Sequence, residues 1–369
     1  MNNYWIDADL ERMNKSLQDI EHETAPVRWS ALSKSGIQSI CIPSEFGGMG
    51  LGVVAAQSAF ESAGRILSDQ SLAFSFAAHV SAFQFPVSLF ATQQLKKQTL
   101  RKCVEGSLIG SFAATEHEAG SDIANISTEY VSCPSGFRLS GRKEFVTNAP
   151  ISNSVLVLAT RNKSLGLAGL SAFVVDTSLP GVIRSAPLEM QGQNAALIGS
   201  ITLSDCIVPK VALLGTEGDG FHILNQAMVR EKSILSALHI GRMQRLLAIV
   251  INHAKNRVQF GRAISSYDSV YSMIVDMKVA IDAGRNLMFS VGRQIDDGHD
   301  ASIEASVAKL FVSESYVNQA RDAVQVFGAQ ATLREHAAIN ELLTAIPSTI
   351  YSGTSEIQRR IIAKSLGLF

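Results

Sequence analysis

The stretch "FRLSGRKEFVTNA", residues 137–149, marks a change in the hydrophobic pattern and decides the class of fold. At its start the apolar residues Phe137 and Leu139 alternate with polar ones. Alternation with a period of two is typical of a β-strand, whereas apolar residues at intervals of three and four are typical of a helix. The stretch therefore predicts a strand, and the extent of this period defines the domain around it.

The period of two extends over residues 111–214, in runs such as "SVLVLATR", "LSAFVVD" and "IGSITLSDCIVP" separated by Gly, Pro, Asn and Ser. On both sides the pattern is helical, as in "AAQSAFESAGRIL" before it and the long segments after "GTEGDG". The sequence thus predicts an α+β multidomain protein. An N-terminal helical domain (1–110) precedes a middle antiparallel β domain (111–214), and a C-terminal helical domain (215–369) follows.

Composition narrows the class of protein. The chain has 369 residues, of which 46% are hydrophobic and 18% charged, as expected for a globular protein with large cores. A net charge of −1 from interspersed residues provides no basic surface for nucleic acid. No signal peptide or run of ~18 apolar residues is evident, and the four cysteines lack metal-ligand spacing. We therefore expect a cytoplasmic protein that does not insert into membranes and holds no metal.

An acid interrupts the apolar face of a predicted helix in "NQAMVREKSILSALHIG", residues 225–241. On a helical wheel Ala227, Ile234 and Leu238 share one face, and Glu231 lies at its centre. Burying an unpaired carboxylate costs several kcal/mol. The side chain is therefore neutralised, paired with a buried partner, or directed into a cavity where a raised pKa makes it a stronger base.

Two motifs lie in the predicted β domain. The loop "FAATEHEAGSD", residues 112–122, offers hydroxyls and backbone N–H groups that could hold a ring edge or a phosphate. In "GRKEFVTNA", residues 141–149, the strand pattern would place Phe145 and Thr147 on one face. A polar connecting loop and ordinary sheet packing explain the same patterns.

Two further motifs lie in the C-terminal domain. "NRVQFG", residues 256–261, ends a long helix with Arg257, which could bind a diphosphate or remain a solvated arginine near the helix end. "IYSGTSEIQRRIIA", residues 350–363, predicts a turn and a helix with Thr354 as N-cap, either to receive an anion or simply to cap the helix.

Taken in order, six motifs resemble the acyl-CoA dehydrogenase family of flavoproteins. They are "IPSEFGGMGLG", "ATEHEAGSDIA", "GRKEFVTNA", the passage from Val208 to Phe221, "NRVQFGRAI", and "QVFGAQ" followed by "IYSGTSEIQRRIIAKSLG". The resemblance implies an N-terminal helical domain, a middle β domain and a C-terminal four-helix bundle. It also implies FAD between the last two domains and a homotetramer or homodimer.

The resemblance implies two sets of FAD contacts. Thr115, Ser121, Phe145 and Thr147 in the β domain would contact FAD, and Thr354 with Glu356 after the last turn would lie near it. The second set would reach FAD from a neighbouring subunit and comprises Arg257, Gln259, Phe260, Gln325 and Gly328.

In the family's reaction a glutamate removes the α-proton of an acyl thioester, and the β-hydride passes to flavin N5. The position where many members carry that glutamate is Ser352 here. The isovaleryl and long-chain types instead carry it on the first bundle helix before a basic residue, which corresponds to Glu231 and Lys232. We therefore expect Glu231 to be the base, and Ser121, Lys232 and Ser352 to contact the substrate.

The sequence leaves several alternatives open. The substrate is either an acyl-CoA or an acyl or aminoacyl thioester of a carrier protein. The electron acceptor is either a protein such as an electron-transfer flavoprotein or oxygen. A flavin monooxygenase or oxidase on the same fold, with a structural Glu231, is an alternative. A non-catalytic FAD-binding scaffold is another.

Overall fold

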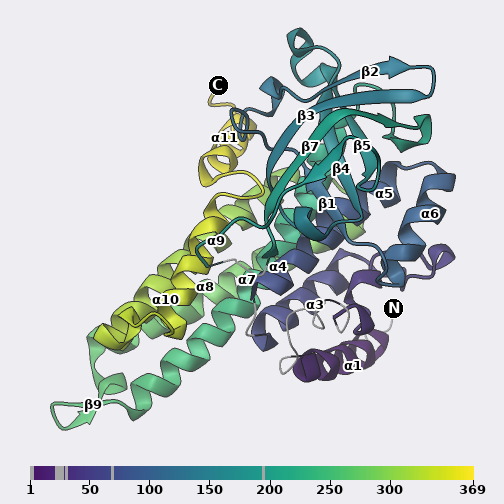
Figure 1. Cartoon of the computed structure of the whole chain (residues 1–369). Coiled ribbons are helices and arrows are strands. Elements are labelled where there is room, and N and C mark those ends of the chain that lie inside the picture. The colour runs from purple at the N-terminus through teal and green to yellow at the C-terminus, as the bar shows by residue number, and fades with distance from the viewer. Residues whose placement is uncertain (1–3, 21–28, 30–31, 68–69, 193–195) are drawn as a thin grey trace.

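The computed structural model describes residues 4–20, 29, 32–67, 70–192 and 196–369. Its N-terminal part is helical (Figure 1). The helices are α1 (Tyr4–Ile20), α3 (Val53–Ile66), α4 (Gln70–Ala78), the π-helix η3 (His79–Gln84), α5 (Phe85–Phe90) and α6 (Gln93–Val104).

The middle part is one eight-stranded sheet. Its strands are β1 (Gly110–Ala113), β2 (Glu129–Cys133), β3 (Gly136–Val146), β4 (Ser154–Thr160), β5 (Leu170–Asp176), β6 (Val182–Arg184), β7 (Gly199–Val208) and β8 (Leu213–Leu214). The order is β6-β7-β3-β2-β4-β5-β8, with β1 paired to β4. The predicted middle β domain is present, but its sheet is mixed, because β1 and β2 pair with β4 in parallel. A hydrophobic period of two shows which face of the sheet each side chain occupies, but it does not show whether the neighbouring strand is parallel or antiparallel.

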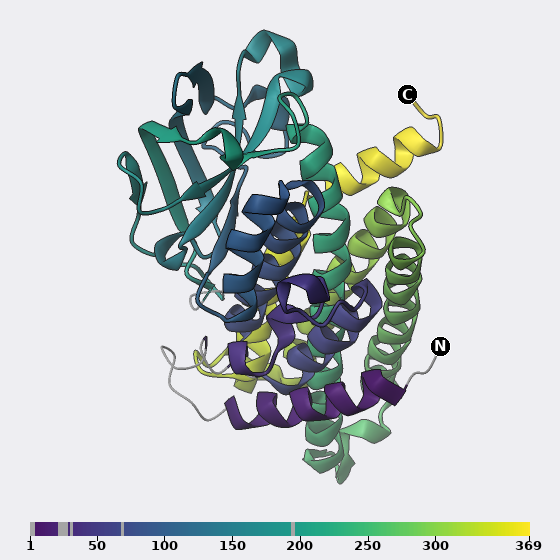
Figure 2. The same ribbon diagram turned by 90° about the vertical axis from the view of Figure 1, so that its right-hand side faces the viewer.

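The C-terminal part is a helical bundle around one long central helix. The helices are α7 (Gly220–Asn256), α8 (Asp268–Asp296), α9 (Ser302–Phe327), α10 (Ala337–Ala345) and α11 (Ser355–Ser365). A short hairpin, β9 (Val258–Gln259) and β10 (Arg262–Ala263), follows α7. It lies at the end of the molecule opposite the β sheet (Figures 1 and 2).

Helix α7 joins the domains because α3, α4, α8 and α9 all pack against it. Residues 231–243 are buried on every side of the helix rather than along the single stripe that the sequence suggested. Two segments, Ser71–Phe90 and Gly220–Asn256, are long and apolar enough to cross a membrane, but 78% and 72% of their windows are buried inside the protein. Core packing therefore accounts for their hydropathy.

Candidate active site

Glu231 lies on α7 and is 9% exposed. Its carboxylate Oε1 accepts a hydrogen bond of 2.7 Å from the Ser352 hydroxyl, although the two residues are 121 positions apart in the chain. Burial raises the pKa of Glu231 from 4.5 to about 7, and the Ser352 hydrogen bond and the charges of Lys232 and Lys309 oppose the rise. The carboxyl group is thus tuned to exchange a proton near neutral pH.

Two buried lysines flank this carboxylate. The Lys232 ammonium donates to the Ser306 hydroxyl at 3.1 Å, and Lys309 on α9 donates to the Gly353 carbonyl at 2.9 Å. Burial lowers the pKa of each lysine to about 8. Lys232 is buried and bonded to α9 because the whole helix is enclosed at this level, and its charge favours the ionised form of Glu231.

The turn before α11 positions Ser352 against Glu231. Ser352 has a φ of 56° and Gly353 a φ of 86°, so a residue with a β-carbon occupies the left-handed region. Gln358 holds this turn by donating to the Ser352 and Gly353 carbonyls. The Thr354 hydroxyl accepts from the Ile357 N–H, which confirms the predicted N-cap. Such strain persists only where neighbouring contacts impose it.

The loop after β1 is held by a buried ion pair. Lys143 is fully buried, and its ammonium lies 2.8 Å from the Glu116 carboxylate. Glu116 also accepts from the backbone N–H groups of Ser127 and Thr128. The Lys143 charge and these bonds lower the pKa of Glu116 to about 2 against the opposing effect of burial. Glu116 of "ATEHEAGSD" therefore holds the loop in place. Ser121, further along the same loop, is exposed.

Phe145 and Thr147 do not share a strand face. Strand β3 ends at Val146, its pairing with β7 is irregular between Lys143 and Val146, and Phe145 has a φ of 54°. The prediction of a shared face is wrong here because a backbone irregularity breaks the alternation of side chains. Phe145 is nevertheless 59% exposed, so its ring is available to a ligand.

The predicted FAD contacts fall into two separate groups. Thr115, Phe145 and Thr147 belong to the β domain, and Thr354 caps α11 at the same end of the molecule (Figures 1 and 2). The second group lies at the opposite end, in the last turn of α9 and just after the C-termini of α7 and α9, and comprises Arg257, Gln259, Phe260, Gln325 and Gly328.

The residues present suit the predicted cofactor. In the first group an exposed aromatic ring at Phe145 and hydroxyls at Thr115, Ser121 and Thr147 offer stacking and hydrogen bonds to a flavin ring. In the second group the exposed Arg257 guanidinium has the geometry that binds a diphosphate. Phe260, which is 96% exposed, has a φ of 50° at the tip of its hairpin.

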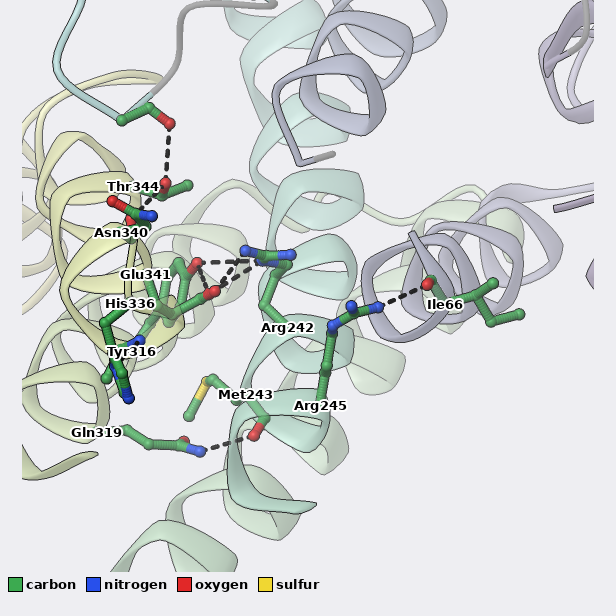
Figure 3. A network of polar contacts seen from close by, with 12 residues as sticks. Ile66, Arg242, Met243, Arg245, Tyr316, Gln319, His336, Asn340, Glu341 and Thr344 are labelled. Carbon is green, nitrogen blue, oxygen red and sulfur yellow. Dashed lines mark hydrogen bonds and ion pairs between the residues drawn. The ribbon is translucent and has the colours of Figure 1, made fainter. Parts of the chain in front are cut away.

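A polar cluster further along α7 was not predicted. The His239 Nε2 lies 2.7 Å from the Tyr351 hydroxyl. Arg242 donates to both carboxylate oxygens of Glu341 on α10, at 3.0 and 2.5 Å, and the Tyr316 hydroxyl donates to the same carboxylate (Figure 3). The sequence does place His239 and Arg242 on the same helix as Glu231. It could not predict their hydrogen-bond partners, which are about a hundred residues away in the chain.

Comparisons with known proteins identify the family. The acyl-CoA dehydrogenase N-terminal, middle and C-terminal domain models match residues 8–107, 111–206 and 218–367. The chain belongs to the acyl-CoA dehydrogenase family. It is 36% identical to L-prolyl-[peptidyl-carrier protein] dehydrogenase of Serratia sp., over 92% of this chain and 88% of the relative.

Solved structures agree with this membership. A structure described as PigA with FAD and proline matches with a TM-score of 0.95 and 33% identity, covering 100% of this chain and 98% of that one. The prolyl acyl carrier protein oxidase AnaB matches with a TM-score of 0.94 and 32% identity over the full length of both chains. The predicted three-part fold is therefore confirmed.

Proposed function

We propose that this protein dehydrogenates a carrier-bound acyl thioester and that Glu231 is the base. As a member of its family it is an oxidoreductase that acts on the CH–CH bond of an acyl thioester, with FAD as cofactor. The observation that carries the assignment to Glu231 is its burial on α7 together with its 2.7 Å contact to Ser352.

The chain's own residues account for the proton transfer. The low-dielectric site raises the pKa of Glu231 to about 7, so its deprotonated form is a stronger base toward an acidic α-carbon than an exposed glutamate. Ser352 donates to the carboxylate and fixes its orientation, while Lys232 and Lys309 limit the cost of its charge. Bound FAD supplies the acceptor for the β-hydride.

FAD binding divides between the two groups described above. Phe145, Thr147, Thr115 and Ser121 would hold the flavin on the side of the β domain. Because Arg257 and Gly328 lie at the opposite end of the chain, we propose that a second subunit supplies them. A homodimer or homotetramer completes the site on this proposal.

The relatives support a proposal for the group that carries the acyl substrate. The identity is 36% to a prolyl-carrier-protein dehydrogenase and 28% to an isovaleryl-CoA dehydrogenase of Solanum tuberosum. We propose an aminoacyl group on a carrier protein, with an acyl-CoA as the alternative. An electron-transfer flavoprotein is the proposed electron acceptor. A cytoplasmic location, suggested by the separated cysteines, is part of the proposal.

A second candidate activity is that of an oxidase, in which oxygen accepts the electrons. The similarity to AnaB, described as an oxidase, favours it. Reduced protein exposed to oxygen separates the two: reoxidation within seconds identifies an oxidase, and persistence of reduced flavin identifies a dehydrogenase that needs a protein acceptor.

Anaerobic titration of the FAD-loaded protein with aminoacyl-carrier and acyl-CoA thioesters tests the function. We expect the flavin absorbance to bleach with an aminoacyl-carrier thioester, and Glu231→Gln to slow bleaching by at least ~100-fold because the base is lost. Glu304→Gln, an exposed glutamate on α9, is the control and should leave the rate unchanged. Bleaching by Glu231→Gln at the wild-type rate would exclude Glu231 as the base.

The stability of Glu231→Gln separates loss of a base from loss of folding. The folded-state pKa of about 7 exceeds the ordinary 4.5, so the folded protein binds the proton more tightly. The charged form therefore destabilises the fold progressively as the pH rises from about 4.5 to 7. At pH 8 we expect Glu231→Gln to be at least as heat-stable as the wild type in a thermal denaturation experiment.

A further inference from the structure

The turn that carries Ser352 is tied to the helical bundle by Lys309. Lys309 lies on α9 and is 4% exposed. Its ammonium donates a 2.9 Å hydrogen bond to the carbonyl of Gly353, the residue that follows Ser352, although Gly353 is 44 positions away in the chain. Because α9 packs along α7, this bond joins the turn before α11 to the part of the bundle that contains Glu231.

The bonds within the turn set its shape rather than its place. Gln358 donates to the carbonyls of Ser352 and Gly353, but it belongs to α11 and moves together with the turn. The left-handed backbone at Ser352, with a φ of 56°, costs free energy and persists only where surrounding contacts impose it. A contact from outside α11, such as the one from Lys309, is what holds the turn against the bundle.

Two further links lie on either side of the turn. Tyr351 reaches α7 through the hydroxyl at the end of its side chain. Arg359, seven residues beyond Ser352, pairs with Glu314 at 2.6 Å, but both side chains are exposed, and an exposed ion pair contributes little. Lys309 instead bonds to the backbone inside the turn, one peptide unit from Ser352. It is therefore the link that acts most directly on the position of the Ser352 hydroxyl.

Lys309 also acts on Glu231 through its charge, and so does Lys232. Burial lowers the pKa of Lys309 to about 8, so its ammonium is charged near pH 7, where Glu231 titrates. The charged groups that act on this ammonium are Lys232 on α7, Glu314 on its own helix, Glu356 in the first turn of α11, and Glu231. Lys232 has the larger charge effect on Glu231, but it bonds to Ser306 and not to the turn. The two lysines thus allow charge and position to be separated.

We propose that Lys309 is a positioning residue for the proton transfer: its bond to the Gly353 carbonyl holds the Ser352 hydroxyl within reach of the Glu231 carboxylate. The proposal rests on the proposed function, in which Glu231 is the base. Without Lys309 the turn is free to move away from α7, and Ser352 loses part of its contact with Glu231. Because that contact stabilises the charged carboxylate, its loss raises the pKa of Glu231 in addition to the effect of removing a charge.

A matched pair of buried variants tests the proposal. Lys309→Met and Lys232→Met each remove one ammonium and one hydrogen bond and keep a side chain of similar length. The Gly353 carbonyl still accepts from Gln358 in Lys309→Met, so no buried acceptor is left unpaired. If charge alone mattered, Lys232→Met would raise the pKa of Glu231 more. We expect the reverse, with Lys309→Met exceeding Lys232→Met by at least about half a pH unit, as partial loss of a hydrogen bond to a carboxylate implies.

Two measurements report the protonation of Glu231. Infrared difference spectra of the FAD-loaded protein between low and high pH contain the carboxylic acid band of Glu231, which is assigned by its absence in Glu231→Gln and needs no substrate. The pH dependence of the limiting rate of flavin bleaching by an aminoacyl-carrier thioester gives the kinetic pKa of the same group. The apparent Kd of the thioester should change by less than about twofold in Lys309→Met, because Lys309 acts on the base and not on substrate binding.

A double variant shows whether Lys309 acts through Ser352. In a Ser352→Ala background there is no hydroxyl to position, so Lys309→Met should raise the pKa of Glu231 no more than Lys232→Met does. Arg359→Met, which removes an exposed link between α9 and α11, is the control and should leave that pKa unchanged. An extra effect of Lys309→Met that persists in the Ser352→Ala background would overturn the positioning role.

Failure of this proposal is distinguishable from failure of the proposed function. If a thioester bleaches the flavin but Lys309→Met raises the Glu231 pKa no more than Lys232→Met does, only the positioning role is overturned. If no thioester bleaches the wild type, the proposed function is overturned whatever the infrared spectra show. FAD content and melting temperature, measured on every variant, show that each is folded and loaded. Lys309→Leu, which removes the same donor and charge, gives the same test if Lys309→Met does not fold.

Discussion

At the scale of single residues, the Ser352 hydroxyl donates a hydrogen bond to Glu231, the proposed base. This bond stabilises the charged form of Glu231, so Ser352→Ala should raise the Glu231 pKa above about 7. Because the deprotonated form reacts, the rising limb of the pH profile should move to higher pH, by up to about one unit. The pH dependence of anaerobic flavin reduction measures this shift. An unmoved limb, as expected for the exposed control Ser365→Ala, would contradict it.

The residue scale also shows where inference from the sequence stops. Helical periodicity predicted that Glu231 lies on an apolar helix face. Because the residue at the family's usual base position is Ser352 and not an acid, Glu231 became the candidate base. The contact between them was not predictable, because the left-handed backbone at Ser352 and the hydrogen bonds from Gln358 determine where the hydroxyl points. The His239–Tyr351 contact depends on the same turn.

At the scale of elements, the buried ion pair between Lys143 on β3 and Glu116 fixes the loop that follows β1, where we propose that the flavin binds. Lys143→Met would leave the Glu116 carboxylate buried without its counter-ion, at a cost of about 3–5 kcal/mol. We expect a lower melting temperature and loss of FAD on gel filtration. Lys163→Met removes an exposed lysine that contacts Ser127 in the same domain and should change little.

A thermodynamic cycle checks that the loss arises from the pair. In Lys143→Met combined with Glu116→Gln no uncompensated charge remains, so the double variant should be more stable than Lys143→Met alone. A double variant that is less stable by the sum of the single effects would show that the two side chains stabilise the domain independently. Strand period predicted β3 but could not predict this pair, since Lys143 is a charged residue at a fully buried position.

At the scale of the whole molecule, the change of hydrophobic period sufficed for the order helices, sheet, helices. It did not give the parallel pairing of β1 with β4 or the enclosure of α7, which depend on contacts between distant segments. The two ends of the bundle carry separate halves of the predicted FAD site. On the proposed arrangement, in which one FAD molecule contacts both groups, that separation makes oligomerisation part of cofactor binding.

Mixed oligomers test this arrangement directly. Phe145→Asp should abolish FAD binding at the β-domain side, and Arg257→Glu should abolish it at the hairpin side; both side chains are exposed, so folding should survive. In a mixed dimer one site collects both defects and the other is intact, so about one site in two should hold FAD. Co-expression with two affinity tags, tandem purification and flavin absorbance per chain measure the occupancy. If each subunit binds FAD alone, every chain of the mixed dimer carries a defect and no flavin is recovered.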